Sequence, residues 1–367
     1  MTPFERRTRD CQSRLRDGAG DALVLFPSQN LFYLSGFSET PDERHLLLFV
    51  PARGDPVFVV PELYADQIRE ASWVDDVRTW SDDEGPRDQL RTVAADLELS
   101  GGRLLVDDTM WARFTQDLRE ILPETTFGLA SDVVAPLRLR KDDAELDALR
   151  RAGRVADRVV DDLRSLGSDA VGMTETELAV DIERRLVDAG GDGTSFEVIV
   201  GSGPNGAKPH HSHGDRVIEA GDPVVLDFGT RVDGYPSDQT RTVVFAGDPS
   251  ETFREVHEIV REAQEAAVAA VEPGVTAGDV DAAARDVVEA AGYGDQFIHR
   301  TGHGVGLDVH EEPYIVAGSD VELEAGMVFS VEPGVYLPGE FGVRIEDLVV
   351  VTDDGCERLN ETERGWR

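Results

Sequence analysis

The feature that most constrains this chain is an internal repeat in its second half. Residues 172–190 and 274–292 both open with Gly-x-Thr, continue with helical spacing and close on Ala-Gly. Each segment leads on to Glu-Ala-Gly and an apolar run, at 224–229 in the first copy and 328–334 in the second. Matching helices and strands in this order predict a duplicated α+β domain with an internal pseudo-two-fold repeat.

Both copies carry acidic residues at corresponding positions. Asp227 matches Glu332, and each copy continues through a glycine-bearing turn to a second acid, Asp238 or Glu346. If the chain returns antiparallel after each turn, the two acids of a copy lie close together. Four carboxylates inside one domain cannot all remain ionised unless cations neutralise them. We therefore expect two divalent cations sharing a water that loses a proton near neutral pH and acts as a nucleophile.

A glycine-rich segment around His303 offers a fifth ligand. The glycines of residues 301–306 let the backbone approach the ions closely, while the imidazole supplies a nitrogen donor. His210 and His310 lie in similar apolar or glycine-rich surroundings. In a chain with 73 acidic residues, any single carboxylate can equally end a strand or form a surface ion pair. The five residues together, in a duplicated context, favour a metal site.

The preceding part of the chain predicts a separate α/β domain. Four apolar runs read as strands and two stretches have helical spacing; these are 22–26, 46–50, 56–60 and 104–106, and 63–72 and 112–121. This region contains neither a nucleotide-binding loop nor a nucleophile motif. Pro136 interrupts the pattern, and a long helix is expected from about 142 to 166. We therefore predict domains at 1–138 and 142–367.

The composition of the chain excludes some classes of protein and favours others. Acidic residues outnumber basic ones by 73 to 36, giving a net charge of -37, and lysine occurs only as Lys141 and Lys208. Such a surface suits molar salt, where the Debye length falls to about 3 Å, so we predict a salt-adapted host. The charge opposes nucleic-acid binding. No apolar stretch approaches the roughly 20 residues of a membrane span. Cys11 and Cys356 lack metal-site spacing, which favours free thiols in the cytoplasm.

Six segments resemble the pita-bread metallopeptidases, above all the Xaa-Pro dipeptidases (prolidases) and Xaa-Pro aminopeptidases. They are Leu226-Asp227-Phe228-Gly229, Ser237-Asp238-Gln239-Thr240-Arg241-Thr242, His299-Arg300-Thr301-Gly302-His303-Gly304-Val305-Gly306-Leu307, Val309-His310-Glu311, Glu332-Pro333-Gly334 and Val343-Arg344-Ile345-Glu346-Asp347. The first domain resembles the creatinase-type N-terminal domain, through residues 30–37 and 137–141. The resemblance implies a peptidase that cleaves the bond between an N-terminal residue and proline.

The resemblance also implies a metal ligand set. Asp227 binds one metal, His303 and Glu332 bind the other, and Asp238 and Glu346 bridge both. Glu332 additionally carries a proton from the attacking water to the leaving amine. Mn²⁺ or Co²⁺ is favoured, and the ligands also suit Fe²⁺ or Zn²⁺.

Three further residues receive roles from the same resemblance. His210 contacts the substrate near the scissile bond, His310 stabilises the carbonyl oxygen as it becomes negative, and Arg344 supports the ligands and can face the substrate carboxylate. The resemblance also implies a homodimer in which residues 37–45 of one subunit line the site of the other. The substrate that the resemblance implies is a peptide with proline in the second position.

Other functions on the same fold stay open. A metal-dependent hydrolase or lyase acting on a small osmolyte fits a salt-adapted host, while a non-catalytic binding homologue is expected to have lost ligands. Methionine aminopeptidases usually lack such an N-terminal domain, and creatinase-like amidinohydrolases dispense with the metals. The departures from the family pattern, at Pro236, Arg300 and Asp308, remove none of the five ligands.

Overall fold

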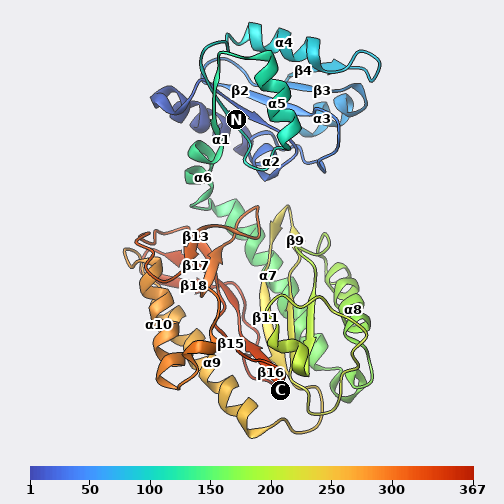
Figure 1. Ribbon diagram of the computed structural model, residues 1–367, viewed down its shortest axis with the longest axis vertical. Helices are drawn as coiled ribbons and strands as arrows, with labels where there is room; N and C mark the ends of the chain where they lie inside the picture. Colours follow the sequence, from blue (N-terminus) through green and yellow to red (C-terminus); the bar gives the residue numbers. More distant parts are fainter. The chain divides into compact units, whose positions relative to one another are not determined.

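The computed structural model describes residues 1–367, which form two compact units, Met1–Arg138 and Leu139–Arg367. In the first unit a six-stranded sheet has the order β4-β3-β2-β1-β5-β6 (Figure 1). Its strands are β1 (Ala22–Leu25), β2 (Leu47–Pro51), β3 (Val57–Pro61), β4 (Asp76–Trp80), β5 (Arg103–Val106) and β6 (Thr126–Leu129). Strands β1, β2 and β3 pair antiparallel, whereas β4, β5 and β6 each join the sheet in parallel.

Helices cover both faces of this sheet because its central strands are apolar on both faces. Val24, Phe49 and Val59 pack in one core with side chains of the helices at 87–96 and 112–121, while the alternate residues of each strand are buried toward the other face. The helices are α1 (Pro3–Arg14), α2 (Gln29–Ser35), α3 (Ala65–Ala71), α4 (Arg87–Asp96), α5 (Ala112–Ile121) and α6 (Ser131–Arg138), with short turns at Leu15–Ala19 and Glu62–Tyr64.

One local prediction for this unit is wrong. Pro136 does not interrupt the structure but lies inside α6. The helix has only 8 residues, so the missing proline N–H costs a single helical hydrogen bond near its end.

The second unit consists of two halves that repeat one another. The first half contains α7 (Asp143–Arg164), α8 (Glu175–Asp188), β7 (Ile199–Ser202), β8 (Val224–Phe228), β9 (Arg231–Val232), β10 (Tyr235–Pro236) and β11 (Gln239–Val243). The second contains α9 (Glu251–Ala269), α10 (Ala277–Ala290), β12 (Gly302–Gly304), β13 (Glu311–Ile315), β14 (Val328–Val331), β15 (Gly334–Leu337), β16 (Phe341–Arg344), β17 (Asp347–Thr352) and β18 (Gly355–Arg358). Three short 3₁₀ turns, Gly167–Ala170, Gly203–Ala207 and Gly294–Gln296, join these elements.

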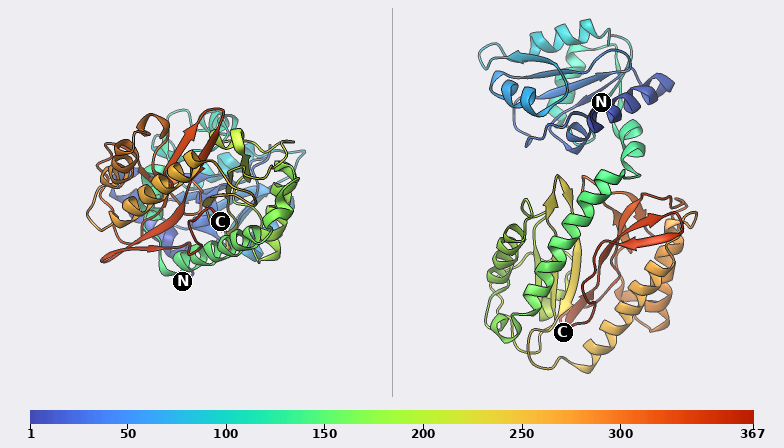
Figure 2. Two further views of the ribbon diagram at one scale, coloured as in Figure 1. Left: turned by 90° about the horizontal axis from the view of Figure 1, so that it is seen from below. Right: turned by 180° about the vertical axis from the view of Figure 1, so that it is seen from behind.

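Helices surround the strands of this unit. Figures 1 and 2 show α8 on one side of the strands and α9 and α10 (orange) on the other, while α7 (green) crosses in front of the strands in the right-hand view of Figure 2. One sheet has the order β11-β8-β7 and the other β13-β12-β14-β17-β18. Each half packs its own helices and strands into a separate hydrophobic core. The strands therefore meet along the middle of the unit, where both halves can contribute side chains.

The predicted repeat is confirmed in detail. Thr174 caps α8 and Thr276 caps α10, each in a capping box with the acid three residues later, Glu177 or Asp279. Each cap residue also forms an isolated antiparallel bridge, Thr174 to Val217 and Thr276 to Glu322. No helix in the structure combines the length and the apolar character needed to cross a lipid bilayer.

Candidate metal centre

A cavity of about 300 Å³ in the second unit is lined by residues of both halves. All eight residues singled out from the sequence line it: His210, Asp227, Asp238, His303, His310, Glu332, Arg344 and Glu346. The wall also contains Phe196, Glu197, Ile199, Pro209, His211, Ser212, His299, Arg300 and Val309. The structure therefore brings together residues that are far apart in the sequence.

Two antiparallel strand pairs position the four carboxylates. Strands β8 and β11 pair with Asp227 opposite Thr240, and Asp238 directly precedes β11. In the other half β14 and β17 pair with Val331 opposite Asp347. Glu332 follows β14 and Glu346 precedes β17, so these two acids meet at the same end of the ladder. The predicted antiparallel return in each half is confirmed.

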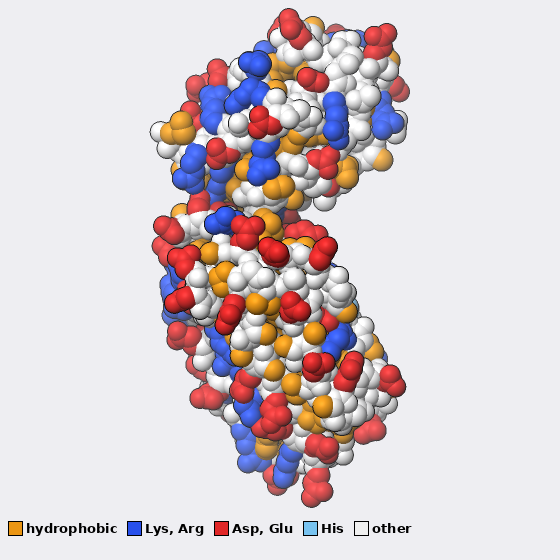
Figure 3. Space-filling model, turned by 90° about the vertical axis from the view of Figure 1, so that its left-hand side faces the viewer, with side chains coloured by type: hydrophobic (Ala, Val, Ile, Leu, Met, Phe, Trp, Pro, Cys, Tyr) orange, Lys and Arg blue, Asp and Glu red, His pale blue; other side chains and the backbone are white.

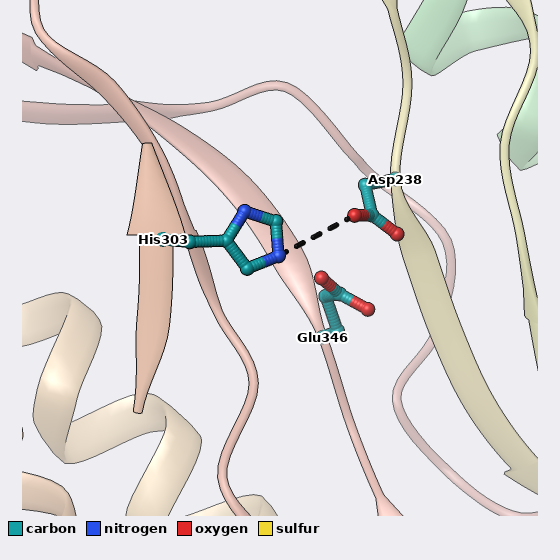
Figure 4. A group of neighbouring side chains, drawn as sticks. All are labelled: Asp238, His303 and Glu346. Atoms are coloured by element: carbon teal, nitrogen blue, oxygen red, sulfur yellow. Dashed lines mark ion pairs between the residues drawn. The ribbon is translucent and has the colours of Figure 1, made fainter. Parts of the chain in front are cut away.

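The imidazole of His303 faces this carboxylate group from strand β12. Its Nε2 lies 3.3 Å from Glu332 Oε1 and 3.7 Å from Asp238 Oδ2. Figure 4 shows His303, Asp238 and Glu346 pointing toward one another from three separate segments, and one potential ligand atom from each lies within 4.8 Å of the other two. The Nδ1 atom of His303 lies 3.3 Å from the Gly304 carbonyl oxygen. Because a carbonyl only accepts, Nδ1 carries the proton in the neutral ring and Nε2 keeps its lone pair.

The electrostatics of the cavity favour bound cations. Burial, together with the neighbouring carboxylates Glu346 and Asp227, raises the pKa of Asp238 well above its ordinary value. Burial and then Glu332 and Asp227 do the same to the pKa of Glu346. Two oxygens, Asp227 Oδ1 and Glu346 Oε1, are buried and have no hydrogen-bond partner. Buried acceptors without donors and carboxylates that resist ionisation both fit a site for divalent ions.

The histidine is also in the protonation state that a metal ligand needs. Burial lowers the pKa of His303 to about 4, so its ring is neutral at pH 7. Burial and then His303 lower the pKa of His310 to about 4 as well. The two rings are neighbours, with centroids 4.0 Å apart. Two neutral imidazoles therefore stand side by side at one wall of the cavity.

Arg344 links several parts of the cavity wall. Its Nη2 donates to Asp227 Oδ2 at 2.6 Å, its Nε to Thr240 Oγ1 at 3.0 Å, and its Nη1 to Tyr336 Oη at 2.9 Å. Nη1 also lies 3.3 Å from the Pro209 carbonyl oxygen. The arginine is buried, so it fixes Oδ2 of Asp227 and leaves Oδ1 without a hydrogen-bond partner.

Other supporting residues were not assigned a role from the sequence. The Thr240 hydroxyl donates to Glu346 Oε2 at 2.6 Å, and the Ser330 hydroxyl donates to Glu332 Oε1 at 3.0 Å. Tyr336 Oη lies 2.9 Å from His299 Nε2. A hydroxyl residue two positions before or after a ligand on a strand is a weak signal, because threonine and serine are common in strands for other reasons.

Comparison with known proteins agrees with this geometry. Residues 147–353 match the family model described as metallopeptidase family M24, and residues 7–140 match the creatinase/prolidase N-terminal domain. The chain is 42% identical over 361 residues to the probable dipeptidase PepE of Mycobacterium tuberculosis strain H37Rv, covering 97% of this chain and 94% of the relative. It is 39% identical over 361 residues to the Xaa-Pro dipeptidase of Lactobacillus helveticus, covering 96% of each.

Solved structures agree as well. The crystal structure of a prolidase from Thermococcus sibiricus is similar with a TM-score of 0.94 and 41% identity, and the match covers 99% of this chain and 98% of that one. The fold predicted from the sequence, a creatinase-type N-terminal domain followed by a pita-bread domain, is thereby confirmed. The five candidate ligands all lie within the part of the chain that matches the peptidase model. The chain belongs to metallopeptidase family M24.

Proposed function

We propose that this metallopeptidase is an Xaa-Pro dipeptidase that holds two divalent metal ions in the cavity. The observation that carries the proposal is the convergence of His303 with Asp238 and Glu346, beside the unpartnered buried oxygen of Asp227. Support for the substrate comes from relatives over nearly the whole chain, including an Xaa-Pro dipeptidase at 39% identity. Four carboxylates and one imidazole suit Mn²⁺, Co²⁺, Fe²⁺ or Zn²⁺, and the resemblance to the prolidases favours Mn²⁺ or Co²⁺ as the metal.

In this proposal the ligands divide between the two ions. Asp227 would hold one ion, His303 and Glu332 would hold the other, and Asp238 and Glu346 would complete the ligand set. Ions in such a site supply a nucleophile from water near neutral pH and polarise a carbonyl. Asp227 Oδ2 is already taken by Arg344, so Oδ1 is the oxygen available for the ion.

The chain's own residues move the proton and stabilise the reacting carbonyl. Glu332 takes a proton from the attacking water and delivers it to the proline nitrogen as the peptide bond breaks. The Ser330 hydroxyl holds Glu332 Oε1 in place for this task. His310, neutral at pH 7 because burial lowers its pKa to about 4, donates an N–H to the carbonyl oxygen as negative charge develops there.

His210 and Arg344 have different tasks. His210 lines the cavity on an exposed loop, where it is placed to contact the substrate. Arg344 is engaged with Asp227, Thr240 and Tyr336. We therefore assign Arg344 to holding Asp227.

The test is hydrolysis of Ala-Pro, Ala-Pro-Ala and Ala-Ala in molar KCl with added Mn²⁺, with and without a chelator. We expect cleavage of Ala-Pro that the chelator abolishes, with Ala-Ala resistant. Cleavage of Ala-Pro-Ala at a comparable rate would make the enzyme an aminopeptidase instead. No cleavage by the folded, metal-loaded protein would reject the proposal and favour a small osmolyte as substrate.

We also propose a cytoplasmic homodimer in which residues 37–45 of one subunit line the cavity of the other. The charge and the nearly lysine-free composition support a salt-adapted cytoplasm. Deleting the 37–45 loop is then expected to change the ratio of rates on Ala-Pro and Ala-Pro-Ala. An unchanged ratio contradicts the shared site.

A further inference from the structure

Glu175 is a fully buried acid in the first turn of α8. Its Oε1 accepts from Ser202 N at 2.8 Å, from Ser202 Oγ at 2.8 Å and from Asn205 Nδ2 at 3.1 Å. Its Oε2 lies 2.8 Å from His211 Nε2 and accepts from Gly214 N at 3.2 Å. A single carboxylate thus collects donors from the last residue of β7 and from three residues of the segment that follows it.

That segment, residues 203–214, forms one wall of the candidate site. Pro209, His210, His211 and Ser212 all line the cavity. The segment also contacts Arg344, which donates to the Pro209 carbonyl oxygen at 3.3 Å. The loop is therefore held both by Glu175 and by the arginine that orients Asp227.

The donors around Glu175 require an ionised carboxylate. Burial by itself would raise the pKa of Glu175, but hydrogen bonds from Ser202, His211 and Asn205 outweigh it and hold the pKa below its ordinary value. Because a carboxylate only accepts, His211 Nε2 carries its proton. Lys208 Nζ donates to Asn205 Oδ1 at 2.9 Å, so the amide of Asn205 is oriented with Nδ2 toward Glu175.

A helix-capping role does not account for this arrangement. Acids in the first turn stabilise a helix through its dipole, but Thr174 and Glu177 already form the capping box of α8. The two oxygens of Glu175 contact residues 202–214 instead. Its burial is explained by the loop and not by the helix.

The second half of the domain has a comparable contact at a different helix position, from an acid that also pairs with Arg285. Asp281 on α10 is fully buried and accepts from Thr301 N at 3.1 Å and from Thr301 Oγ1 at 2.7 Å. Thr301 directly precedes β12, the strand that carries His303. Both repeated helices thus present one buried carboxylate that secures the segment bearing histidines of the cavity.

We propose that Glu175 is a positioning residue that holds the 203–214 loop so that His210 and His211 face the substrate. The inference deepens the proposed function and rests on it, since it assigns these histidines to substrate binding. Neither histidine is among the proposed metal ligands. Loss of Glu175 should therefore weaken substrate binding and leave metal binding intact.

The test compares E175Q with E177Q. Both changes remove one negative charge from the same helical turn, but Glu177 contacts only Thr174 in the capping box. The side-chain amide introduced by E175Q turns one acceptor into a donor facing other donors, so we expect kcat/KM for Ala-Pro to fall about 10–100-fold, mainly through KM. Mn²⁺ affinity measured by calorimetry stays within about twofold of the parent. Equal KM values for E175Q and E177Q overturn the proposal.

A second set of variants separates positioning from general destabilisation. In a background with His210→Ala and His211→Ala, E175Q is expected to raise KM no further, because its effect runs through those side chains. A further rise of the same size as in the parent overturns the proposal. If E175Q is too unstable to purify, Ser202→Ala removes one donor to the same carboxylate and should raise KM several-fold.

Amide hydrogen exchange tests the hold of Glu175 on the loop without relying on enzyme activity. Amides of residues 202–214 should exchange faster in E175Q than in E177Q, and equal exchange in that segment overturns the proposal. If the parent protein cleaves no Xaa-Pro peptide, the proposed function fails. Faster exchange in E175Q would then still support the hold of Glu175 on the loop.

Discussion

Asp347 follows the proposed ligand Glu346 and is fully buried. Its two oxygens accept from Arg241, Arg358 and Arg364, at 2.8, 2.7 and 2.7 Å. Arg241 also donates to the backbone carbonyl of Glu346 at 2.6 Å. Burying a charge is costly unless it is paired and hydrogen-bonded, and here the pairing fixes the backbone beside a ligand. Neighbouring acids thus differ in task, since Glu346 faces the cavity and Asp347 the interior.

His257 on α9 predicts how stability depends on pH. The side chain is buried and its Nε2 has no hydrogen-bond partner. Burial lowers its pKa to about 4, against about 6.5 in the unfolded chain. Keeping His257 neutral therefore contributes fully to the free energy of unfolding above pH 6.5. This contribution is lost as the pH falls toward 4, which lowers the free energy of unfolding by up to about 3 kcal/mol.

The measurement is urea unfolding of the metal-free protein at pH 6.5 and pH 5. We expect His257→Asn to lose less unfolding free energy than the parent between these two values, because asparagine does not titrate. A parent-sized loss in the variant would show that other groups dominate the acid response.

At the level of elements, Gly229 joins β8 to the turn that leads to Asp238. A Cβ added there would lie 1.8 Å from the Ser237 carbonyl oxygen, so a side chain forces the two strands apart. The same strand ends are held by Ser237 N donating to the Thr230 carbonyl at 2.7 Å and Thr230 N donating to Ser237 Oγ at 3.0 Å. The close approach therefore sets where Asp238 lies.

We expect Gly229→Ala to weaken Mn²⁺ binding about 10-fold or more and to lower the melting temperature. Calorimetric titration and thermal unfolding measure the two effects. Gly365→Ala is the matched control, because a Cβ at Gly365 meets no atom within 4 Å. Unchanged metal affinity in Gly229→Ala would mean that Asp238 tolerates the strand shift or does not bind metal.

The elements also show what the sequence can and cannot reveal. The central strands β1, β2 and β3 are buried throughout and read as continuous apolar runs, so they were predicted. The edge strands β4 and β6 are only partly buried, and their mixed polar composition gives no strand pattern.

The sequence likewise revealed some residues of the candidate site and not others. Duplication made Asp227, Asp238, Glu332 and Glu346 recognisable, because each acid has a counterpart in the other half. Glu175 was missed because an acid after Thr174 reads as part of a helix cap. Its real partners, including His211 and Gly214, belong to a loop whose path the sequence pattern does not give.

At the scale of the whole molecule, the excess of acidic residues determines how stability depends on salt. The net charge is -37, and Figure 3 shows acidic side chains spread over the visible face, with basic ones interspersed. Mutual repulsion among surface acids destabilises the compact state at low ionic strength. Salt weakens it because the Debye length falls from about 10 Å at 0.1 M to about 3 Å at 1 M.

We expect the melting temperature to rise by several degrees or more between 0.1 M and 2 M KCl, measured by circular dichroism. Sucrose at matched osmolality is the control, since it strengthens burial without screening charge. A melting temperature that does not change with KCl would contradict the prediction of salt adaptation.

The division of the candidate ligands between two halves has a further consequence. Asp227 and Asp238 belong to one half, and His303, Glu332 and Glu346 to the other, each half with its own core. An ion bound to both halves would stabilise the folded protein as well as take part in catalysis, because it binds the native state and not the unfolded chain. Chains made when the ion is scarce would open more often and reach the cell's proteases sooner. The supply of metal would then govern how long each molecule survives as well as how fast it works.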